Sequence, residues 1–560
     1  MTYRTEELLQ GAEKPFYRSI FKSMGYTDNE LDHKPIIGIA NTWNNLLPGH
    51  YNLNQIAARV REGIFAGGGT PCEFGCIALC DAIGQGNEGM HYMLPSRDLI
   101  ANCVETEARA NHLDGLVMLA SCDKIVPAML MAAARLDIPA LIVCGGPMLG
   151  GIEFDGRQTD MTSTDEAMGM LRAGKISQST YDSLENLVCP GCGSCSFFGT
   201  ANSMCCLTEA MGMMLPGGAL IPAAYAARLR HAFESGMAVV DLCKKGITAR
   251  QIITEKNMRN TIRVAMAVAA STNSLLHLSA VAHEAELNLK VIDEYEKFNR
   301  EIPQIAKVNP ASKWNMEDFY RAGGIPRVMS RLGDMLETDA LTVSGKTVKD
   351  NLEAYRYEYP ENNEVIKTID DPFLVSGGLA IMRGNICPDT GISKPGAIVK
   401  EMHHFVGEAI CFDSEEEANK AILDGKVKPG NVIVLRYEGP KGGPGMREMY
   451  KSMKYLYGMG LATSTALITD GRFSGTNNGC YVGHISPEAA DGGVLAVIKD
   501  GDVIEIDVDN GTLNVKLSDE ELNKRLAEWK PVKKDIPRGY LRMYAKFATS
   551  AAKGGYIDIE

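Results

Sequence analysis

Three adjacent side chains that could each do chemistry, Cys122, Asp123 and Lys124, follow a short apolar run at residues 116–120. An apolar run of this length that ends in polar residues predicts a buried parallel strand. Ligands of open α/β sheets bind beyond the carboxyl ends of the strands, so a thiol, a carboxylate and an amine at this place indicate a ligand site. The alternative is an ion pair between Asp123 and Lys124 beside an inert cysteine, because structural ion pairs are common and contribute little.

The segments around these residues predict a βαβ unit. Residues 127–135 have the pattern of a helix with proline in its first turn, and residues 140–144 form a second apolar strand. Upstream, the apolar residues 77–79 predict a further strand that ends at Asp81. Because the carboxyl ends of parallel strands lie at the same edge of a sheet, we expect the carboxylates of Asp81 and Asp123 to converge.

Two cysteines lie where a thiol could bind iron. The sequence has 15 cysteines, and this odd number favours metal sites or buried thiols over disulfides in a large chain of this kind. Cys122 follows a predicted strand, and Cys195 lies in a glycine-rich loop, residues 189–199, that opens a helix near residue 200. Thiols at such junctions can be exposed and acidified, so both residues are candidate iron ligands.

The other cysteines give no comparable indication of a metal site. Cys189 and Cys192 have the spacing of half a zinc knuckle, but no pair of this spacing lies outside residues 189–195, which argues against structural zinc. Cys72, Cys76 and Cys80 are spaced by four residues, a spacing that also arises in packed cores. We expect these three cysteines to be core residues.

The composition excludes two classes of partner. The net charge is -13 and the chain has no basic block, so nucleic acid is not expected as a partner. No apolar run reaches the roughly 18 residues that a membrane helix needs. Residues 1–14 lack the apolar core of a signal peptide, so a cytoplasmic protein is expected. An acidic protein that binds an acidic substrate needs local cations, for which a divalent metal ion is the usual solution.

The chain divides into two predicted domains. Residues 1–360 carry the βαβ pattern and long helical stretches, which predicts an α/β domain. Charged and turn-rich residues 361–372 indicate a linker. Residues 373–560 predict a β-rich, barrel-like domain with flanking helices. Its predicted strands are residues 378–382, 397–400, 432–436, 465–468 and 503–508, the last followed by a hairpin turn at 509–511.

Two polar residues of the second domain lie beyond predicted strands. Glu448 follows a glycine- and proline-rich loop at residues 437–447, and Ser474 lies in a tight polar loop after residues 465–468. Taken alone, both residues have ordinary structural explanations. A carboxylate stabilises the first turn of a helix, and Ser474 is a turn serine whose surroundings do not match the Gly-x-Ser-x-Gly turn of serine hydrolases.

Four segments, in this order along the chain, together resemble the dihydroxy-acid dehydratase and sugar-acid dehydratase family: residues 122–124 (CDK), 192–195 (CGSC) with 200–204 (TANSM), 438–446 (EGPKGGPGM) and 469–475 (TDGRFSG). The resemblance extends over essentially the whole chain. Residues 95–100 and 321–326 are more similar to the dihydroxy-acid branch of the family than to the sugar-acid branch.

The resemblance implies a doubly wound, parallel-sheet N-terminal domain and a β-barrel-like C-terminal domain, with the active site between them. It also implies homodimers or dimers of dimers that contain an iron–sulfur cluster and Mg²⁺. Cys122 and Cys195 correspond to cluster ligands, and the Mg²⁺ ligands correspond to Asp81, Asp123, Lys124 and Glu448. Lys124 is expected to carry a carbamate, which replaces an amine by the oxygen ligands that Mg²⁺ prefers.

The sequence departs from the family pattern at the third cluster ligand. Many members with a two-iron cluster carry a cysteine in a Pro-Cys motif after the first strand, where this chain has Gly49. Glycine cannot ligate iron, so both a [2Fe–2S] and a [4Fe–4S] cluster remain open, with Cys192 as a candidate third ligand. Cys80 stands where relatives often have a second aspartate before Asp81.

The reaction implied is the dehydration of a 2,3-dihydroxy acid, 2,3-dihydroxyisovalerate or 2,3-dihydroxy-3-methylvalerate, to a 2-keto acid in branched-chain amino acid biosynthesis. Ser474 corresponds to the catalytic base that takes the C2 proton. Two alternatives remain: a sugar-acid (aldonate) dehydratase with the same machinery, and a non-catalytic iron–sulfur sensor. A sensor needs no base, so Ser474 together with the Mg²⁺ ligands argues against it.

Overall fold

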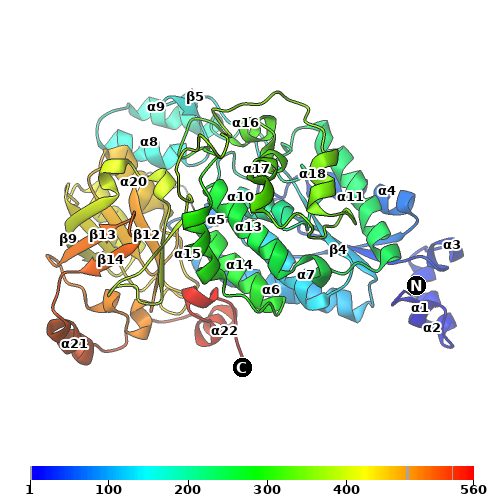
Figure 1. Ribbon diagram of the computed structural model, residues 1–560. Helices are drawn as coiled ribbons and strands as arrows, with labels where there is room; N and C mark the ends of the chain where they lie inside the picture. Colours follow the sequence, from blue (N-terminus) through cyan, green and yellow to red (C-terminus); the bar gives the residue numbers. More distant parts are fainter. Residues whose placement is uncertain (1–2, 475–478, 533, 560) are drawn as a thin grey trace.

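The computed structural model describes residues 3–474, 479–532 and 534–559 of the chain. Figure 1 shows an α/β domain, coloured blue to green, beside a β-rich domain, coloured yellow to orange. Gly475, the last residue of the fourth family motif, lies outside the described residues. None of the helices in the described ranges has both the length and the apolar character needed to cross a membrane.

A four-stranded parallel sheet organises the first domain. Its order is β2-β1-β3-β4, with β1 (Ile36–Asn41), β2 (Thr70–Gly75), β3 (Gly115–Ala120) and β4 (Ala140–Cys144). β1, β3 and β4 are buried along their whole length, as their continuous apolar sequences predict. From β1 the chain moves to β2 on one side and then to β3 on the other. This reversal makes the sheet doubly wound and opens a crevice beyond the carboxyl ends of β1 and β3.

Helices cover this sheet. α4 (Leu53–Gly67) packs against α11 (Ala226–Lys245), and α6 (Met90–Ala110) packs against α7 (Ile125–Leu136). α6 begins well before residue 98, where its pattern predicts the start, and it contains Pro95. The other elements of the domain are α1 (Glu6–Leu9), α2 (Lys14–Ser23), α3 (Asp28–Leu31), α5 (Asp81–Gly84), β5 (Glu153–Phe154), β6 (Arg157–Gln158), α8 (Ser163–Arg172), α9 (Gln178–Ser183), α10 (Thr200–Ala210), α12 (Ala249–Ile252), α13 (Glu255–Ala267), α14 (Asn273–Glu284), α15 (Val291–Glu301), α16 (Met316–Arg321), α17 (Gly324–Leu332) and α18 (Val348–Ala354).

The strand predicted at residues 77–79 is wrong. The strand of this region is β2, and residues 76–80 form a loop that leads to Asp81, the first residue of α5. β2 lies at the edge of the sheet and contains Pro71, which an edge strand tolerates. Because only its first two residues are buried and the other four are partly or fully exposed, it lacks the continuous apolar run by which a central strand is recognised.

An eight-stranded sheet that nearly closes on itself forms the second domain, as the barrel prediction requires. Its order is β14-β13-β9-β10-β11-β12-β8-β7, and β9 to β12 are parallel. The edges meet at Arg383, which exchanges backbone hydrogen bonds of 2.8 Å with Gly511 and Leu513. The elements are β7 (Ala380–Met382), β8 (Thr390–Ser393), β9 (His404–Phe412), α19 (Glu415–Leu423), β10 (Asn431–Leu435), α20 (Tyr450–Met459), β11 (Ala466–Thr469), β12 (Cys480–Ser486), β13 (Val503–Asp507), β14 (Thr512–Val515), α21 (Asp519–Glu528) and α22 (Tyr540–Phe547).

One predicted strand of this domain, residues 397–400, is also wrong. Two short 3₁₀ turns, η3 (Pro395–Ala397) and η4 (Lys400–Met402), occupy this region. Pro395 lacks the N–H group that a strand ladder needs, which explains the interruption. The other predicted strands are present, with ends that differ by one or two residues from the prediction.

The domains are joined first through α8 and α20. The two helices approach so closely that a Cβ on Gly169 would stand 2.8 Å from the Cα of Gly458. A buried ion pair between Lys454 Nζ and Glu166 Oε1, 2.9 Å long, spans the same contact. Only glycine permits this approach of the two backbones, and the ion pair adds a directional link beside it.

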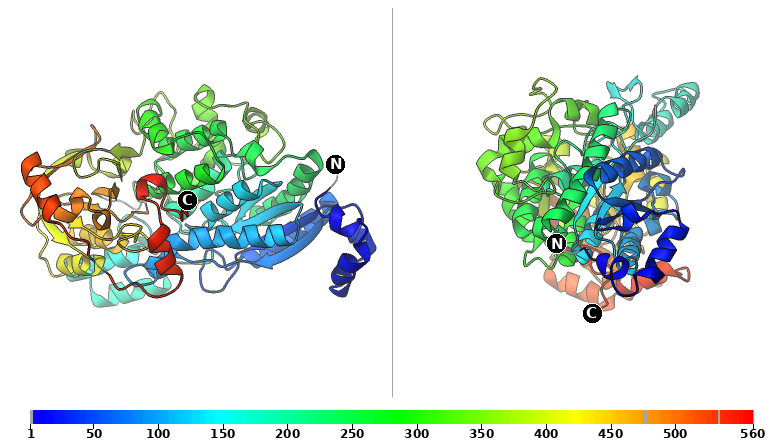
Figure 2. Two further views of the ribbon diagram at one scale, coloured as in Figure 1. Left: turned by 90° about the horizontal axis from the view of Figure 1, so that it is seen from below. Right: turned by 90° about the vertical axis from the view of Figure 1, so that its right-hand side faces the viewer.

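The second connection is made by the C-terminal residues, which return to the first domain. Figure 2 shows the red C-terminal segment beside the light-blue helices of that domain, and α22 packs against α6. Beyond α22, Arg97 Nη1 donates to the carbonyl oxygen of Gly554 at 3.0 Å. Asp98 Oδ1 accepts the backbone N–H of Ile557 at 2.9 Å. The end of the chain therefore binds the middle of α6.

Candidate active site

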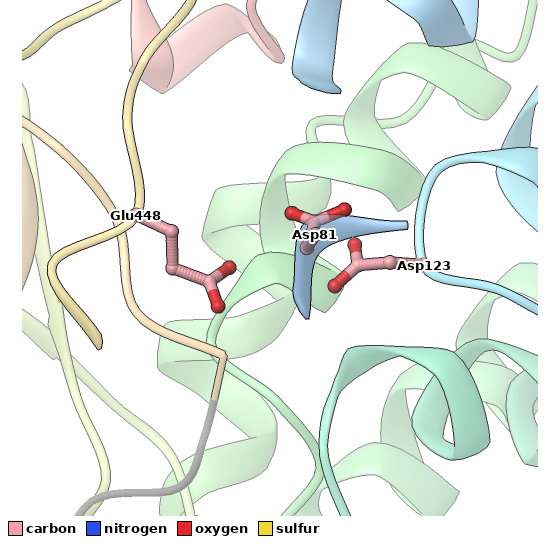
Figure 3. A group of neighbouring side chains, drawn as sticks. All are labelled: Asp81, Asp123 and Glu448. Carbon is pink, nitrogen blue, oxygen red and sulfur yellow. The ribbon is translucent and has the colours of Figure 1, made fainter. Parts of the chain in front are cut away.

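Three carboxylates from distant parts of the chain form one buried group. Asp81 begins α5, Asp123 follows β3, and Glu448 precedes α20. One oxygen atom of each carboxylate lies within 4.8 Å of the others. Figure 3 shows Glu448 pointing toward the two aspartates from the opposite side. The structure thus brings Asp81 and Asp123 together, as the sequence predicts, and the second domain supplies the third carboxylate.

A glycine-rich loop carries Glu448 to this position. Gly445 has a left-handed φ of 88°, and a Cβ on it would stand 1.9 Å from the carbonyl oxygen of His91 in α6. Only glycine fits there. Beyond the loop, Glu448 pairs with Arg472 in an isolated parallel bridge. This bridge places the two loops that contain Glu448 and Ser474 side by side.

Two buried cations lie among the carboxylates. The Lys124 ammonium is 3.1 Å from Asp81 Oδ2 and also bonds Asp123. The Arg472 guanidinium is 2.8 Å from Asp81 Oδ2 and also bonds Glu448. One arginine therefore connects carboxylates of both domains. Apart from its place in the fourth family motif, no sequence signal indicates this role for Arg472.

Burial and these neighbours shift the pKa values of the group. Burial raises the pKa of Glu448, although Arg472 opposes this effect. Burial lowers the pKa of the Lys124 amine to about 8, and Arg472 adds to the effect. In Asp81, the effect of burial is outweighed by Lys124 and Arg472, so its pKa lies below the ordinary value. Near pH 8, Lys124 is therefore divided between the ammonium and the neutral amine, the form that reacts with CO₂.

Neutral side chains complete the surroundings of the carboxylates. Gln85 Nε2 donates to Glu448 Oε1 at 3.2 Å, and Asn273 Nδ2 donates to Glu448 Oε2 at 3.1 Å. His277 Nε2 lies 3.7 Å from Asp123 Oδ1. Burial lowers the pKa of His277 well below its ordinary value, so the ring is neutral. Because these residues come from α14 and the loop after α5, no local sequence pattern places them at the site.

The donor atoms of the group suit a divalent cation. Carboxylate oxygens are the ligands that Mg²⁺ prefers. Among the described residues, nothing donates a hydrogen bond to the buried Asp81 Oδ1, and burying such an oxygen is unfavourable unless a cation approaches it. The group therefore fits Mg²⁺ when Lys124 is not an ammonium, because two positive charges would otherwise compete for the same oxygen atoms.

A cavity between the two domains, the inner cavity, is lined by the carboxylates, a serine and three thiols: Asp81, Asp123, Glu448, Ser474, Cys80, Cys122 and Cys195. The first domain holds the backbone around the serine. Thr200 Oγ1 donates to the carbonyl oxygen of Ser474 at 3.4 Å, and Thr272 Oγ1 donates to that of Phe473 at 2.8 Å. Ser474 therefore shares one cavity with the carboxylates, although it belongs to the other domain.

Three cysteines reach this cavity. Cys122 and Cys195 line it, as their candidate role requires, and Cys80 lies beside Cys122. Cys80 packs against the core of the first domain, as expected, and the loop before α5 also brings it to both cavities, which the sequence does not predict. The outer cavity adjoins the inner one and shares these thiols, and its further lining residues include Pro48, Gly49 and Cys189. Cys192, the candidate third ligand, lines neither cavity.

His50 holds the loop that carries Cys122. Its Nε2 accepts the backbone N–H groups of Ser121 and Cys122 at 3.3 and 3.1 Å, and its Nδ1 lies 2.9 Å from the carbonyl oxygen of Thr42. Burial lowers the pKa of His50 to about 4, so the ring is neutral and Nε2 can accept. The loop after β1 therefore fixes the loop after β3, on which Cys122 and the candidate metal ligands Asp123 and Lys124 lie.

The fold and the inner cavity define a two-domain α/β enzyme whose polar site draws residues from both domains. The N-terminal and C-terminal models of the dihydroxy-acid/6-phosphogluconate dehydratases match residues 34–351 and 364–555. The chain belongs to this dehydratase family.

Its relatives match over nearly their whole length. A protein named dihydroxy-acid dehydratase from Acetivibrio thermocellus is 47% identical over 559 residues, which cover 99% of this chain and 100% of that protein. Proteins of the same name from Caldanaerobacter subterraneus and Pyrococcus furiosus are each 48% identical. The first match covers 98% of both chains, and the second covers 99% of this chain and 100% of the relative.

Proposed function

We propose that the chain is a hydro-lyase that converts a 2,3-dihydroxy carboxylic acid to the 2-keto acid, with 2,3-dihydroxyisovalerate and 2,3-dihydroxy-3-methylvalerate as substrates. The observation that carries the proposal is the inner cavity, where carboxylates, thiols and a serine from two domains face one space. The names of the relatives support this substrate class. The sugar-acid alternative has no comparable support.

The donor sets assign a place to each metal group. In the proposal, Mg²⁺ is held by Asp81, Asp123, Glu448 and a carbamate on Lys124, and the iron–sulfur cluster is held by Cys122 and Cys195. When bound, these groups supply two Lewis acids, one that acidifies the C2 proton of the substrate and one that assists departure of the 3-hydroxyl group.

The chain's own residues orient the substrate and move its proton. Ser474 takes the C2 proton, a role that fits its position in the same cavity as the aspartates. Arg472 bonds Asp81 and Glu448, and so holds carboxylates of both domains in one arrangement. The neutral ring of His277 beside Asp123 leaves that carboxylate free to bind a cation. Burial of the group excludes bulk water, which strengthens each of these interactions.

A substrate comparison tests the proposal. The reconstituted protein is assayed without oxygen for 2-keto acid formation from 2,3-dihydroxyisovalerate and from a panel of aldonates, with Glu448→Gln as the inactive control. We expect the higher kcat/KM with the branched dihydroxy acid. A preference for an aldonate would make the protein a sugar-acid dehydratase, and a cluster-loaded protein with no turnover on either class would support the sensor alternative.

We also propose a homodimer or a dimer of dimers in the cytoplasm, which is the assembly that the family resemblance implies. Light scattering of the metal-loaded protein tests the assembly. A monomer at micromolar concentration would contradict it.

A further inference from the structure

Residue 49 cannot supply a sulfur atom to the cavities. Gly49 lies on the wall of the outer cavity, a space of about 530 Å³ that the three thiols border. This volume is within the range of small-molecule sites. A Cβ on Gly49 would stand 2.6 Å from Cys122 Sγ, closer than real Cβ contacts. Cys122 thus faces bare backbone on this side, and a third sulfur must come from another segment.

Cys80 is placed to provide that sulfur. It lies beside Cys122, and it borders both cavities together with Cys122 and Cys195. Cys195 is also close enough to Cys80 for the two to interact electrostatically. The three thiols reach the same space from three separate segments, namely the loop before α5, the loop after β3 and the loop before α10. Thiols that reach one space can hold one cluster, because iron–sulfur clusters are bound by cysteine thiolates.

The other nearby cysteines are less well placed to supply the third sulfur. Cys72 and Cys76 pack against the core of the first domain, as Cys80 does, but neither of them borders either cavity. Cys189 borders only the outer cavity and is exposed. Cys192 borders neither cavity. Among the described cysteines, these positions leave Cys80 as the one that joins Cys122 and Cys195 at both cavities.

We infer that Cys80 is the third thiolate ligand of the iron–sulfur cluster, together with Cys122 and Cys195. The inference deepens the proposed function and rests on it. Three thiolates leave one coordination position on the cluster open, which is what a Lewis acid that binds a substrate hydroxyl requires. Because Cys80 and Asp81 are adjacent, one short segment then carries a ligand for each of the two metal groups.

Anaerobic reconstitution with iron and sulfide tests this assignment in Cys80→Ala, with Cys76→Ala as the matched control four residues earlier. Three properties are measured: iron and sulfide per chain, the electron paramagnetic resonance spectrum of the reduced cluster, and the affinity for Mn²⁺ as a substitute for Mg²⁺. We expect Cys80→Ala to lose most of its iron and to change the spectrum of what remains, while it binds Mn²⁺ like the wild type. Cys76→Ala is expected to match the wild type in all three.

Several outcomes would overturn the assignment. The assignment is wrong if Cys80→Ala keeps its full iron content and an unchanged spectrum. It is also wrong if Cys189→Ala or Cys192→Ala loses iron while Cys80→Ala does not. Simultaneous loss of Mn²⁺ binding in Cys80→Ala would also count against it, because that result marks a general collapse of the site. Wild-type protein that takes up no iron would contradict the proposed function itself.

A second variant moves the thiol. Adding Gly49→Cys to Cys80→Ala places a sulfur at the wall that Gly49 leaves bare, at the expense of a small shift of the Cys122 side chain. Recovery of the lost iron in this double variant is expected, because the site then again has three thiols.

Discussion

At the scale of single residues, Lys124 is the group whose chemistry depends most on its neighbours. It is fully buried and lies between Asp81 and Asp123. As an ammonium it competes with Mg²⁺ for the carboxylates, whereas as a carbamate it joins them as an oxygen ligand. Modification of this one side chain would therefore convert a closed group of ion pairs into a metal site.

We expect the uptake of CO₂ at Lys124 to increase as the pH rises through about 8, the pKa of the buried amine. Only the neutral amine reacts, and its fraction grows as the pH passes the pKa. Nuclear magnetic resonance with ¹³C-bicarbonate measures the carbamate signal. The signal should be absent from Lys124→Met and present in Lys394→Met, which removes another buried lysine. A signal that persists in Lys124→Met would place the carbamate elsewhere.

Ser474→Ala is expected to lower kcat by about 10²–10⁴-fold, the usual contribution of a general base. Iron content and Mn²⁺ affinity should not change, because the proposed ligands of both metal groups are other residues. Exchange of the substrate C2 hydrogen with deuterated solvent measures the proton step directly. Ser464→Ala, a turn serine of the same domain that donates to the carbonyl oxygen of Leu461, serves as the control. If Ser474→Ala exchanged the C2 hydrogen as fast as the wild type, the base would be another residue.

At the scale of elements, the loops after β1 and β3 act as one unit through His50. We expect His50→Leu to destabilise the metal-free protein by about 1–3 kcal/mol, because two buried N–H groups lose their acceptor. The variant should also release iron to a chelator faster, since the Cys122 loop is no longer held. Urea unfolding and chelator kinetics measure the two effects. His404→Leu, at an exposed histidine of β9, should leave both unchanged, and equal iron release from both variants would contradict the role of His50.

Burial decides which elements could be predicted from the sequence. β3 and β4 are covered on both faces, so their sequences are continuous apolar runs that are easily recognised. β2 lies at an edge and is buried only at its first two residues, so its sequence has no continuous apolar run. The apolar residues 77–79 imitate a strand, yet Ile77 is 46% exposed in a loop. Apolar character alone therefore does not distinguish a strand from a loop that approaches a ligand crevice.

The site residues also differ in whether their positions could be predicted from the sequence. Asp81 and Asp123 could be placed together from the chain, because parallel strand ends share an edge and both residues lie near it. Glu448 and Ser474 were indicated only by the family motifs, since their positions depend on how two domains pack. Cys80 packs against the core as predicted, but its approach to the cavities could not be predicted, because the strand predicted before it does not exist. Contacts between distant segments carry no local signal, and these are what the structure adds.

At the scale of the whole molecule, the C-terminal residues are connected to the carboxylate group through two side chains. Arg97 donates to Gly554 at 3.0 Å and also lies 3.3 Å from His277 Nδ1. His277 in turn faces Asp123. The arginine is fully buried, so its position depends on these few partners. The end of the chain is therefore a part of the structure that supports the site.

Ending the chain at Phe547 is expected to weaken Mn²⁺ binding and to lower the thermal unfolding midpoint. Arg97 and Asp98 each lose a hydrogen bond, and bonds to charged groups contribute roughly 1.5–3 kcal/mol each. Calorimetry measures the affinity and the midpoint. A chain that ends at Asp558, and so lacks only the exposed Ile559 and the last residue, is the control. Wild-type affinity in the longer truncation would show that the C-terminal residues do not support the site.

The return of the chain's end to α6 bears on how the protein is made in the cell. Cys80, Asp81 and Cys122 leave the ribosome early, Glu448 and Ser474 leave much later, and the segment that packs on α6 follows them. N-terminal domains generally fold first during synthesis, so the first domain can form with its thiols and aspartates in place before the second domain closes the cavity over them. The inner cavity is therefore completed only after the residues of the second domain have been synthesised and have packed against the first domain.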